Sequence, residues 1–274
     1  MKGRLSSLVW GNVPRRIVTV LVGFTIFAVP CILWGRTALT PNSQGETMPG
    51  RELFTMSSPP EYVTFDSITD NPRVGAEPNF LRVSRGNNEG YSDTMTMQEG
   101  GTYYVRLYVH NNARDDLHLF STNTRVHINL PLGEGIWGKK YEVNGFIWSD
   151  NARPNEIWDN IVLRSDREFH VKVISAKYYN NIRTEATNGF DLGSDLFDTQ
   201  DSRTAASSFV TPLMQKGLGM VSWVWGPGPG ANPVSSKDKY GYGARIGYEQ
   251  MDGDVPSGLA YSGYVLVKFQ PVFK

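Results

Sequence analysis

The chain has 274 residues, enough for one or two domains with a hydrophobic core. Its 27 basic and 27 acidic residues cancel, so the overall electrostatic field does not attract nucleic acid, and no nucleic-acid partner is expected. The single cysteine, Cys31, excludes a disulfide within the chain, and an exported domain would have to be stable by packing alone. With 28 Gly and 13 Tyr, the composition favours short strands and turns over helices.

A charge-free apolar run from Ile17 to Trp34 lies close to the N-terminus. At about 1.5 Å per residue it would span roughly 27 Å, close to the hydrocarbon thickness of a bilayer. Basic residues are concentrated before the run: Lys2, Arg4, Arg15 and Arg16 precede it, and Arg36 follows. The positive-inside rule therefore predicts a single-pass signal anchor in the cell membrane, with a cytoplasmic N-terminus and an extracytoplasmic C-terminal part.

A cleaved signal peptide is the competing interpretation of the same segment. The run is longer than the 7–15 residues typical of a signal-peptide core, and no Ala-x-Ala site follows it. Lipid attachment at Cys31 is disfavoured because the preceding residue is Pro30, where a small residue is required. The pattern favours an uncleaved anchor and leaves cleavage open.

The chain is predicted to divide into four parts. Residues 1–16 form a cytoplasmic tail, 17–34 the transmembrane helix, and 35–60 a flexible linker rich in Pro, Ser and Gly. Residues 61–274 form an extracytoplasmic β domain. From about residue 181 the pattern loosens into glycine-rich sequence, and the sequence leaves open whether this part is a second β subdomain or an elaboration of the first.

Alternation of apolar and polar residues dominates the C-terminal part. In 103–110, Tyr103, Val105, Leu107 and Val109 share one face, which is the period of a half-buried strand. Similar patterns predict strands at 62–65, 80–83, 94–97, 124–130, 142–148, 161–163, 169–175, 219–225 and 264–269. Gly- and Asn-rich turns separate them. Many short strands at such spacing indicate an antiparallel β-sandwich, Ig-like or jelly-roll-like.

Several short motifs carry a resemblance to a known group of proteins. They are Tyr62-Val-Thr-Phe-Asp-Ser-Ile-Thr-Asp-Asn-Pro72, Asn79-Phe-Leu-Arg-Val83, Val109-His-Asn-Asn112, Gly247-Tyr-Glu-Gln-Met-Asp-Gly-Asp-Val-Pro256 and Tyr261-Ser-Gly-Tyr-Val265. With them, most of residues 61–274 resembles uncharacterised exported or membrane-anchored β-rich proteins of actinobacteria and related small-genome bacteria. The resemblance implies an extracytoplasmic β-rich fold and supplies no activity.

Catalytic motifs are weak. His110 and His127 fall on the polar faces of predicted strands and are interpreted as solvent-facing, because no His-x-x-x-His or Cys-rich spacing supports a metal site. No Gly-x-Ser-x-Gly elbow occurs. Carboxylate pairs such as Glu156 with Asp159, or Asp115 with Asp116, have the residue types of a glycoside hydrolase. Such pairs arise by chance among 27 acids, so no catalytic residue is assigned and an enzyme is not expected.

Two binding motifs are better candidates. Asp191, Asp195 and Asp198 place carboxylates among glycines in a short loop, as a Ca²⁺ site requires, although ordinary acidic turns are the simpler interpretation. Trp223 and Trp225 lie two residues apart, so they share one face if the segment is a strand, and exposed indoles there would stack on sugars. Burial in the core is the simpler interpretation.

These observations together predict a membrane-anchored cell-surface protein with a structural or protein-interaction role at the bacterial envelope. The first alternative is a carbohydrate-binding module directed at the cell wall, and the second is a glycoside hydrolase. Expected partners are the membrane, through residues 17–34, and either an envelope protein or a wall glycan. No cofactor is expected, apart from the Ca²⁺ that the Asp191 loop would hold.

Overall fold

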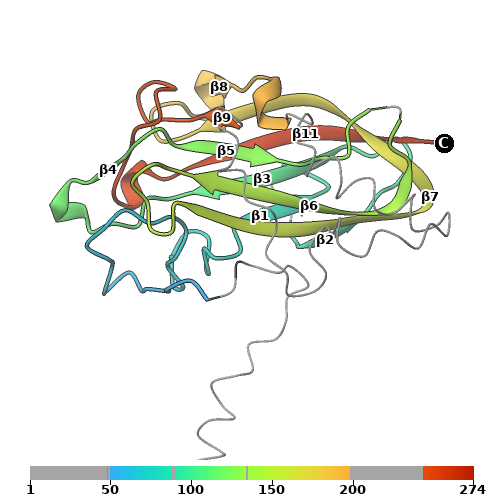
Figure 1. Cartoon of the computed structure of the whole chain (residues 1–274). Coiled ribbons are helices and arrows are strands. Elements are labelled where there is room, and N and C mark those ends of the chain that lie inside the picture. Colours follow the sequence, from blue (N-terminus) through green and yellow to red (C-terminus); the bar gives the residue numbers. More distant parts are fainter. Residues whose placement is uncertain (1–47, 49, 88–89, 134, 198–242) are drawn as a thin grey trace, which may run out of the picture. The chain divides into compact units, whose positions relative to one another are not determined.

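A computed structural model describes residues 48, 50–87, 90–133, 135–197 and 243–274, all within one compact unit, Ser43–Lys274 (Figure 1). The predicted membrane helix at 17–34 and the predicted strand at 219–225 lie outside the described residues. Among the residues that are described, no helix is both long and apolar enough to cross a membrane. The described part is mainly β, with short 3₁₀ turns.

Eleven strands and four 3₁₀ turns make up the described secondary structure. The strands are β1 Leu81–Ser84, β2 Thr94–Thr96, β3 Tyr103–Val109, β4 Phe120–Ser121, β5 Arg125–Ile128, β6 Gly138–Trp148, β7 Glu156–Tyr179, β8 Phe190–Asp191, β9 Ala244–Arg245, β10 Val255–Pro256 and β11 Gly263–Phe273. The 3₁₀ turns are η1 Asp115–Leu117, η2 Glu185–Thr187, η3 Ser194–Phe197 and η5 Leu259–Tyr261.

Nine of the strands form one sheet. Its path is β1–β3–β11–β7–β6–β5–β9, with β2 and β8 also paired to β7, while β4 and β10 form a separate two-stranded sheet (Figure 1). All pairs along the path are antiparallel, and β2 alone pairs in parallel with β7. The prediction of a mainly antiparallel β fold is therefore confirmed.

Strand β3 shows why alternating residues form this sheet. Tyr103, Val105, Leu107 and Val109 are completely buried, as the period of two predicts. The strand is paired on both edges, by β1 on one side and β11 on the other, so its backbone donors and acceptors are satisfied while this face packs into the core.

The long strand β7 joins two regions that the sequence separates. Its first half pairs with β6 and its second half with β11, and the strand curves around one end of the sheet (Figure 1). The strands expected at 161–163 and 169–175 are thus parts of one 24-residue strand. The polar residues between them, such as Asp166 and Arg167, are exposed at the bend, which explains why the apolar pattern lapses while the strand continues.

Gly145 marks a close approach between strands that are distant in the sheet order. It lies on β6, and a Cβ atom there would be 2.8 Å from Cδ1 of Leu81 on β1 and 3.0 Å from Cδ1 of Leu107 on β3. Both leucines are completely buried, so neither has free space to move into. Strand β6 therefore packs against β1 and β3 at this glycine.

Replacing Gly145 by valine is expected to lower the free energy of unfolding by about 1–3 kcal/mol, the usual cost of overpacking a core. Urea unfolding of the purified chain, followed by tryptophan fluorescence, measures the change. Gly193→Ala is the matched control, because a Cβ at Gly193 meets nothing within 4 Å. Equal stability of Gly145→Val and the native protein would mean that β1 and β3 do not pack on this strand.

Candidate binding site

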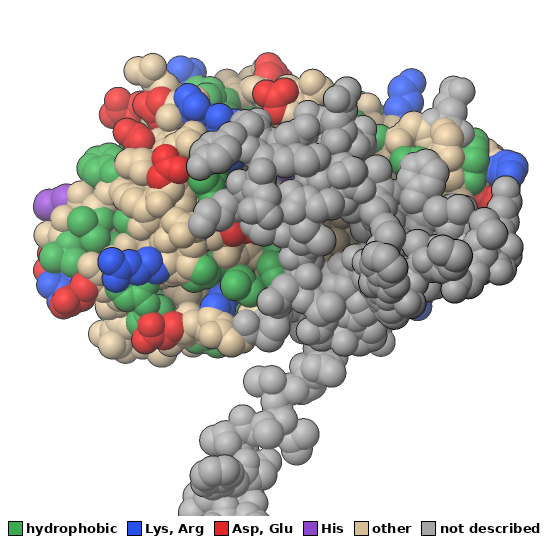
Figure 2. All heavy atoms as spheres, in the orientation of Figure 1, with side chains coloured by type: hydrophobic (Ala, Val, Ile, Leu, Met, Phe, Trp, Pro, Cys, Tyr) green, Lys and Arg blue, Asp and Glu red, His purple; other side chains and the backbone are tan. Residues whose placement is uncertain are grey.

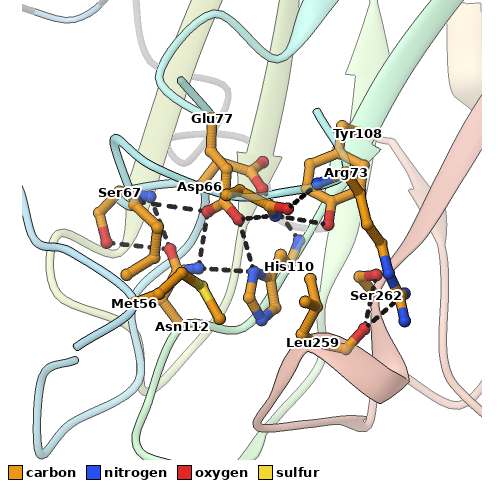
Figure 3. Close-up of polar contacts among 12 residues, drawn as sticks. Met56, Asp66, Ser67, Arg73, Glu77, Tyr108, His110, Asn112, Leu259 and Ser262 are labelled. Atoms are coloured by element: carbon orange, nitrogen blue, oxygen red, sulfur yellow. Dashed lines mark hydrogen bonds and ion pairs between the residues drawn. The ribbon is translucent and has the colours of Figure 1, made fainter. Parts of the chain in front are cut away.

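A network of buried polar side chains lies where β3 ends, and Glu77 is at its centre (Figure 3). One carboxylate oxygen of Glu77 is 2.7 Å from Nδ1 of His110, and the other accepts a hydrogen bond of 2.7 Å from Asn112. The Asn71 side chain and the backbone N–H of Ile68 also donate to this carboxylate. Four donors thus surround one completely buried carboxylate, which is the compensation that a buried charge requires.

A loop before β1 and the segment after β3 hold the network in place. Asp66 accepts a hydrogen bond of 2.9 Å from the backbone N–H of His110 and donates its own N–H to the His110 carbonyl at 3.1 Å. The side-chain oxygen of Asn112 accepts from both the N–H and the hydroxyl of Ser67. Asp66 has a φ of 44°, a left-handed conformation that Asp and Asn tolerate better than most residues.

His110 is buried, and the prediction that it faces solvent is wrong. Strand β3 ends at Val109, so the alternation that suggested a solvent-facing position no longer applies at residue 110, and the Asp66 loop covers it. Nδ1 of the ring lies in the network, whereas Nε2 has no hydrogen-bond partner among the described residues. His127, also predicted to face solvent, is likewise buried, at 4 % exposed.

The free side of the His110 ring faces a cavity of about 260 Å³. Its apolar walls come from three distant parts of the chain: Met56, Pro59, Ile68, Ala113 and Leu259. Asp115, Asp116 and Arg114 line it as well, and Arg114 is paired with Asp116 at 2.7 Å and with Glu61 at 2.9 Å. We call this space the His110 cavity.

Gly258 forms part of the wall of the His110 cavity. Its φ of 105° is one that residues with a side chain rarely adopt. A Cβ atom there would lie 1.5 Å from Oδ1 of Asp115, so the absent side chain makes room for this carboxylate.

A second, larger depression of about 580 Å³ is lined by residues from two stretches of the chain, 118–120 and 248–261. It combines aromatic and acidic side chains, and we call it the acidic aromatic pocket: His118, Phe120, Tyr248, Glu249, Asp252, Asp254, Pro256, Ser257 and Tyr261. The rings of Tyr248 and Tyr261 meet edge to face at 4.9 Å, and Phe120 is 52 % exposed. On the face shown in Figure 2, acidic, basic and apolar side chains are interspersed over the described part.

Acidic groups outnumber basic ones in the described interior around this site. Asp66, Glu77 and Asp159 are completely buried, and the partly buried Arg51 donates to the backbone carbonyls of Phe65 and Asp66. Burial raises the pKa of Asp66 well above its ordinary value, although the positive charge of Arg51 opposes the shift. Burial also raises the pKa of Asp159 and lowers that of Arg51.

Asp159, one of the carboxylates considered for glycoside hydrolysis, has a structural position. Its two oxygens accept hydrogen bonds of 2.8 Å from the backbone N–H groups of Leu81 and Asn160. The carboxylate therefore ties the start of β1 to β7. Glu156, its proposed partner, lies at the first position of β7.

The predicted Ca²⁺ ligands are only partly described. Asp191 pairs with Lys177 at 2.6 Å, Asp195 lies in η3, and Asp198 lies outside the described residues. Within the described ranges, no group of three or more His, Cys, Asp or Glu side chains is arranged to hold a metal ion. Trp223 and Trp225, the predicted sugar-stacking residues, also lie outside the description, so both hypotheses stay predictions.

Comparison with known proteins gave no match of any kind. No protein-family model, no curated protein and no solved structure is similar to this chain.

Proposed function

We propose that this chain is a single-pass membrane protein of the bacterial envelope, whose extracytoplasmic β domain binds a protein partner and has no catalytic role. The apolar run at 17–34 and the basic residues before it support the membrane anchor and its orientation. The packing of Gly145 on Leu81 and Leu107 supports a sandwich arrangement of the two halves of the sheet.

The acidic aromatic pocket is the observation that carries the binding role. It places Glu249, Asp252 and Asp254 beside the half-exposed ring of Phe120. Carboxylates attract Lys and Arg side chains, and an exposed ring offers both an apolar surface for their methylene stems and a face for cation–π contact. The partner therefore presents a basic segment.

A wall carbohydrate is the second candidate. Sugars also bind to exposed aromatic rings flanked by hydrogen-bond acceptors, and the pocket offers Phe120, Tyr248 and Tyr261 beside carboxylates. The basic protein segment ranks first because three carboxylates line one depression, whereas neutral sugars need no such concentration of negative charge.

Crosslinking on the living cells that carry the protein tests this role. The tagged full chain is expected to capture one envelope protein reproducibly, and the double variant Phe120→Ala with Glu249→Gln is expected to lose most of it. Ile174→Ala with Asp166→Asn is the matched control, because it removes an exposed apolar residue and an exposed acid elsewhere. Undiminished capture by the pocket variant would refute the pocket as the binding site, and recovery of glycan without protein would favour the carbohydrate candidate.

A further inference from the structure

The His110 cavity has one feature that a merely structural void lacks. His110 is only 3 % exposed, and its Nε2 atom is buried without a hydrogen-bond partner among the described residues. Buried polar atoms are nearly always hydrogen-bonded, so an unpartnered one beside a cavity indicates a group that binds there. In Figure 3 the ring lies between Met56 and Leu259, with its far side directed away from Glu77.

We propose that the His110 cavity binds an alkylammonium group, as carried by a lysine side chain or a free aliphatic amine. The cavity is separate from the acidic aromatic pocket, and this proposal holds or fails independently of the protein partner proposed above.

The hydrogen bonds of Glu77 determine what Nε2 can bind. Nδ1 of His110 lies 2.7 Å from one oxygen of Glu77 and 2.8 Å from the side-chain nitrogen of Asn112, which already donates to the other Glu77 oxygen. Because a carboxylate oxygen can only accept, the tautomer that pairs with Glu77 carries its proton on Nδ1. Nε2 then carries a lone pair directed at the cavity, and it accepts a hydrogen bond from an N–H donor. An ammonium group is the strongest such donor.

The surrounding charges favour a cation over an anion. Glu77 lies directly behind the ring, and Asp115 and Asp116 line the cavity. Arg114, the basic residue of the lining, is already shared between Asp116 and Glu61. A carboxylate in this space would meet the like charges of Glu77 and Asp115, which Arg114 does not pair with, whereas an ammonium would be attracted by both.

The walls and size suit an alkyl chain. Met56, Pro59 and Leu259 offer apolar surface of the kind that covers methylene groups. The volume of about 260 Å³ lies below the range of roughly 300–1,000 Å³ typical of pockets for drug-sized ligands, so a single chain fits better than a ring system.

Nuclear magnetic resonance of ¹⁵N-labelled histidine in the detergent-solubilised full chain tests the proposal directly. The chain has four histidines, so each imidazole is assigned by single substitution. Titration with n-butylammonium is expected to shift the Nε2 signal of His110 saturably and to leave His118, His127 and His170 unchanged. Butyrate and n-butanol serve as the anionic and neutral probes of equal length and are expected to bind at least tenfold more weakly. Nα-acetyl-lysine methylamide distinguishes the sources, since binding of this derivative identifies a peptide lysine and its failure identifies a free amine.

Two variants separate binding from folding. Asp115→Asn is expected to weaken butylammonium binding about two- to five-fold, the usual effect of one exposed charge, whereas the matched control Asp166→Asn leaves it unchanged. Leu259→Trp, which fills the cavity, is expected to abolish the shift while the spectrum of the other histidines stays native. Preferential binding of butyrate would overturn the proposal by showing a protonated ring that takes anions. Absence of any saturable shift at His110 would overturn it in favour of a cavity that holds only water.

Discussion

Replacing Glu77 by alanine is expected to lower the free energy of unfolding of the domain by about 3–5 kcal/mol, the range found when one partner of a buried charged pair is removed. The substitution leaves the buried side chains of Asn71, His110 and Asn112 without their common acceptor. It also leaves a cavity where the side chain was, which adds to the loss.

Chemical denaturation of the full chain, followed by tryptophan fluorescence, measures this loss. Glu77→Gln is expected to fall between the native protein and Glu77→Ala, because the amide keeps one oxygen acceptor but directs an N–H₂ group at other donors. Glu61→Ala is the matched control, since Glu61 is an exposed acid of the same type with 73 % of its side chain accessible. A loss below about 1 kcal/mol for Glu77→Ala would show that the network contributes little to stability.

The strands were predictable because alternation records burial directly. Tyr103 to Val109 repeat every second residue, and every apolar member of that set is completely buried. The length of β7 was not predictable, because the exposed residues at its bend resemble a turn in their composition. The chain stays extended there because β7 pairs with β6 along its first half and with β11 along its second half. Pairing with strands that are distant in the sequence cannot be recognised from the alternation of neighbouring apolar and polar residues.

The candidate site was missed for a related reason. Residues 56–59, 110–116 and 258–259 meet at the His110 cavity, and no spacing in the sequence connects them. A weak signal was present, since His110, Asn111 and Asn112 follow a strongly apolar strand without a charged residue among them. All three are buried, and Asn111 donates to the backbone carbonyls of Leu119 and Val255. Amide-rich sequence directly after a core strand thus indicates a turn held by side chains as readily as an exposed loop.

Replacing Asp66 by asparagine is expected to stabilise the domain at pH 8 by about 1–3 kcal/mol, because the neutral amide avoids the desolvation cost of a buried carboxylate. Asparagine has the same shape, tolerates the positive φ, and keeps an oxygen to accept the N–H of His110. The other carboxylate oxygen, Oδ2, has no hydrogen-bond partner among the described residues, so replacing it by an amide nitrogen breaks no hydrogen bond.

The pH dependence of this stabilisation follows from the direction of the pKa shift. Burial raises the pKa of Asp66 in the folded state, so the folded protein holds this proton more tightly than the unfolded chain does. The stability that the group contributes is complete below the unfolded pKa of about 3.9, and it is lost as the pH rises through the raised folded value. The advantage of Asp66→Asn should therefore shrink as the pH falls toward 4.

Asp159, whose pKa is raised in the same direction, is present in both proteins and cancels in the comparison. Urea unfolding at several pH values measures the difference, and a variant less stable than the native protein at pH 8 would show that the Asp66 carboxylate is ionised and held by Arg51.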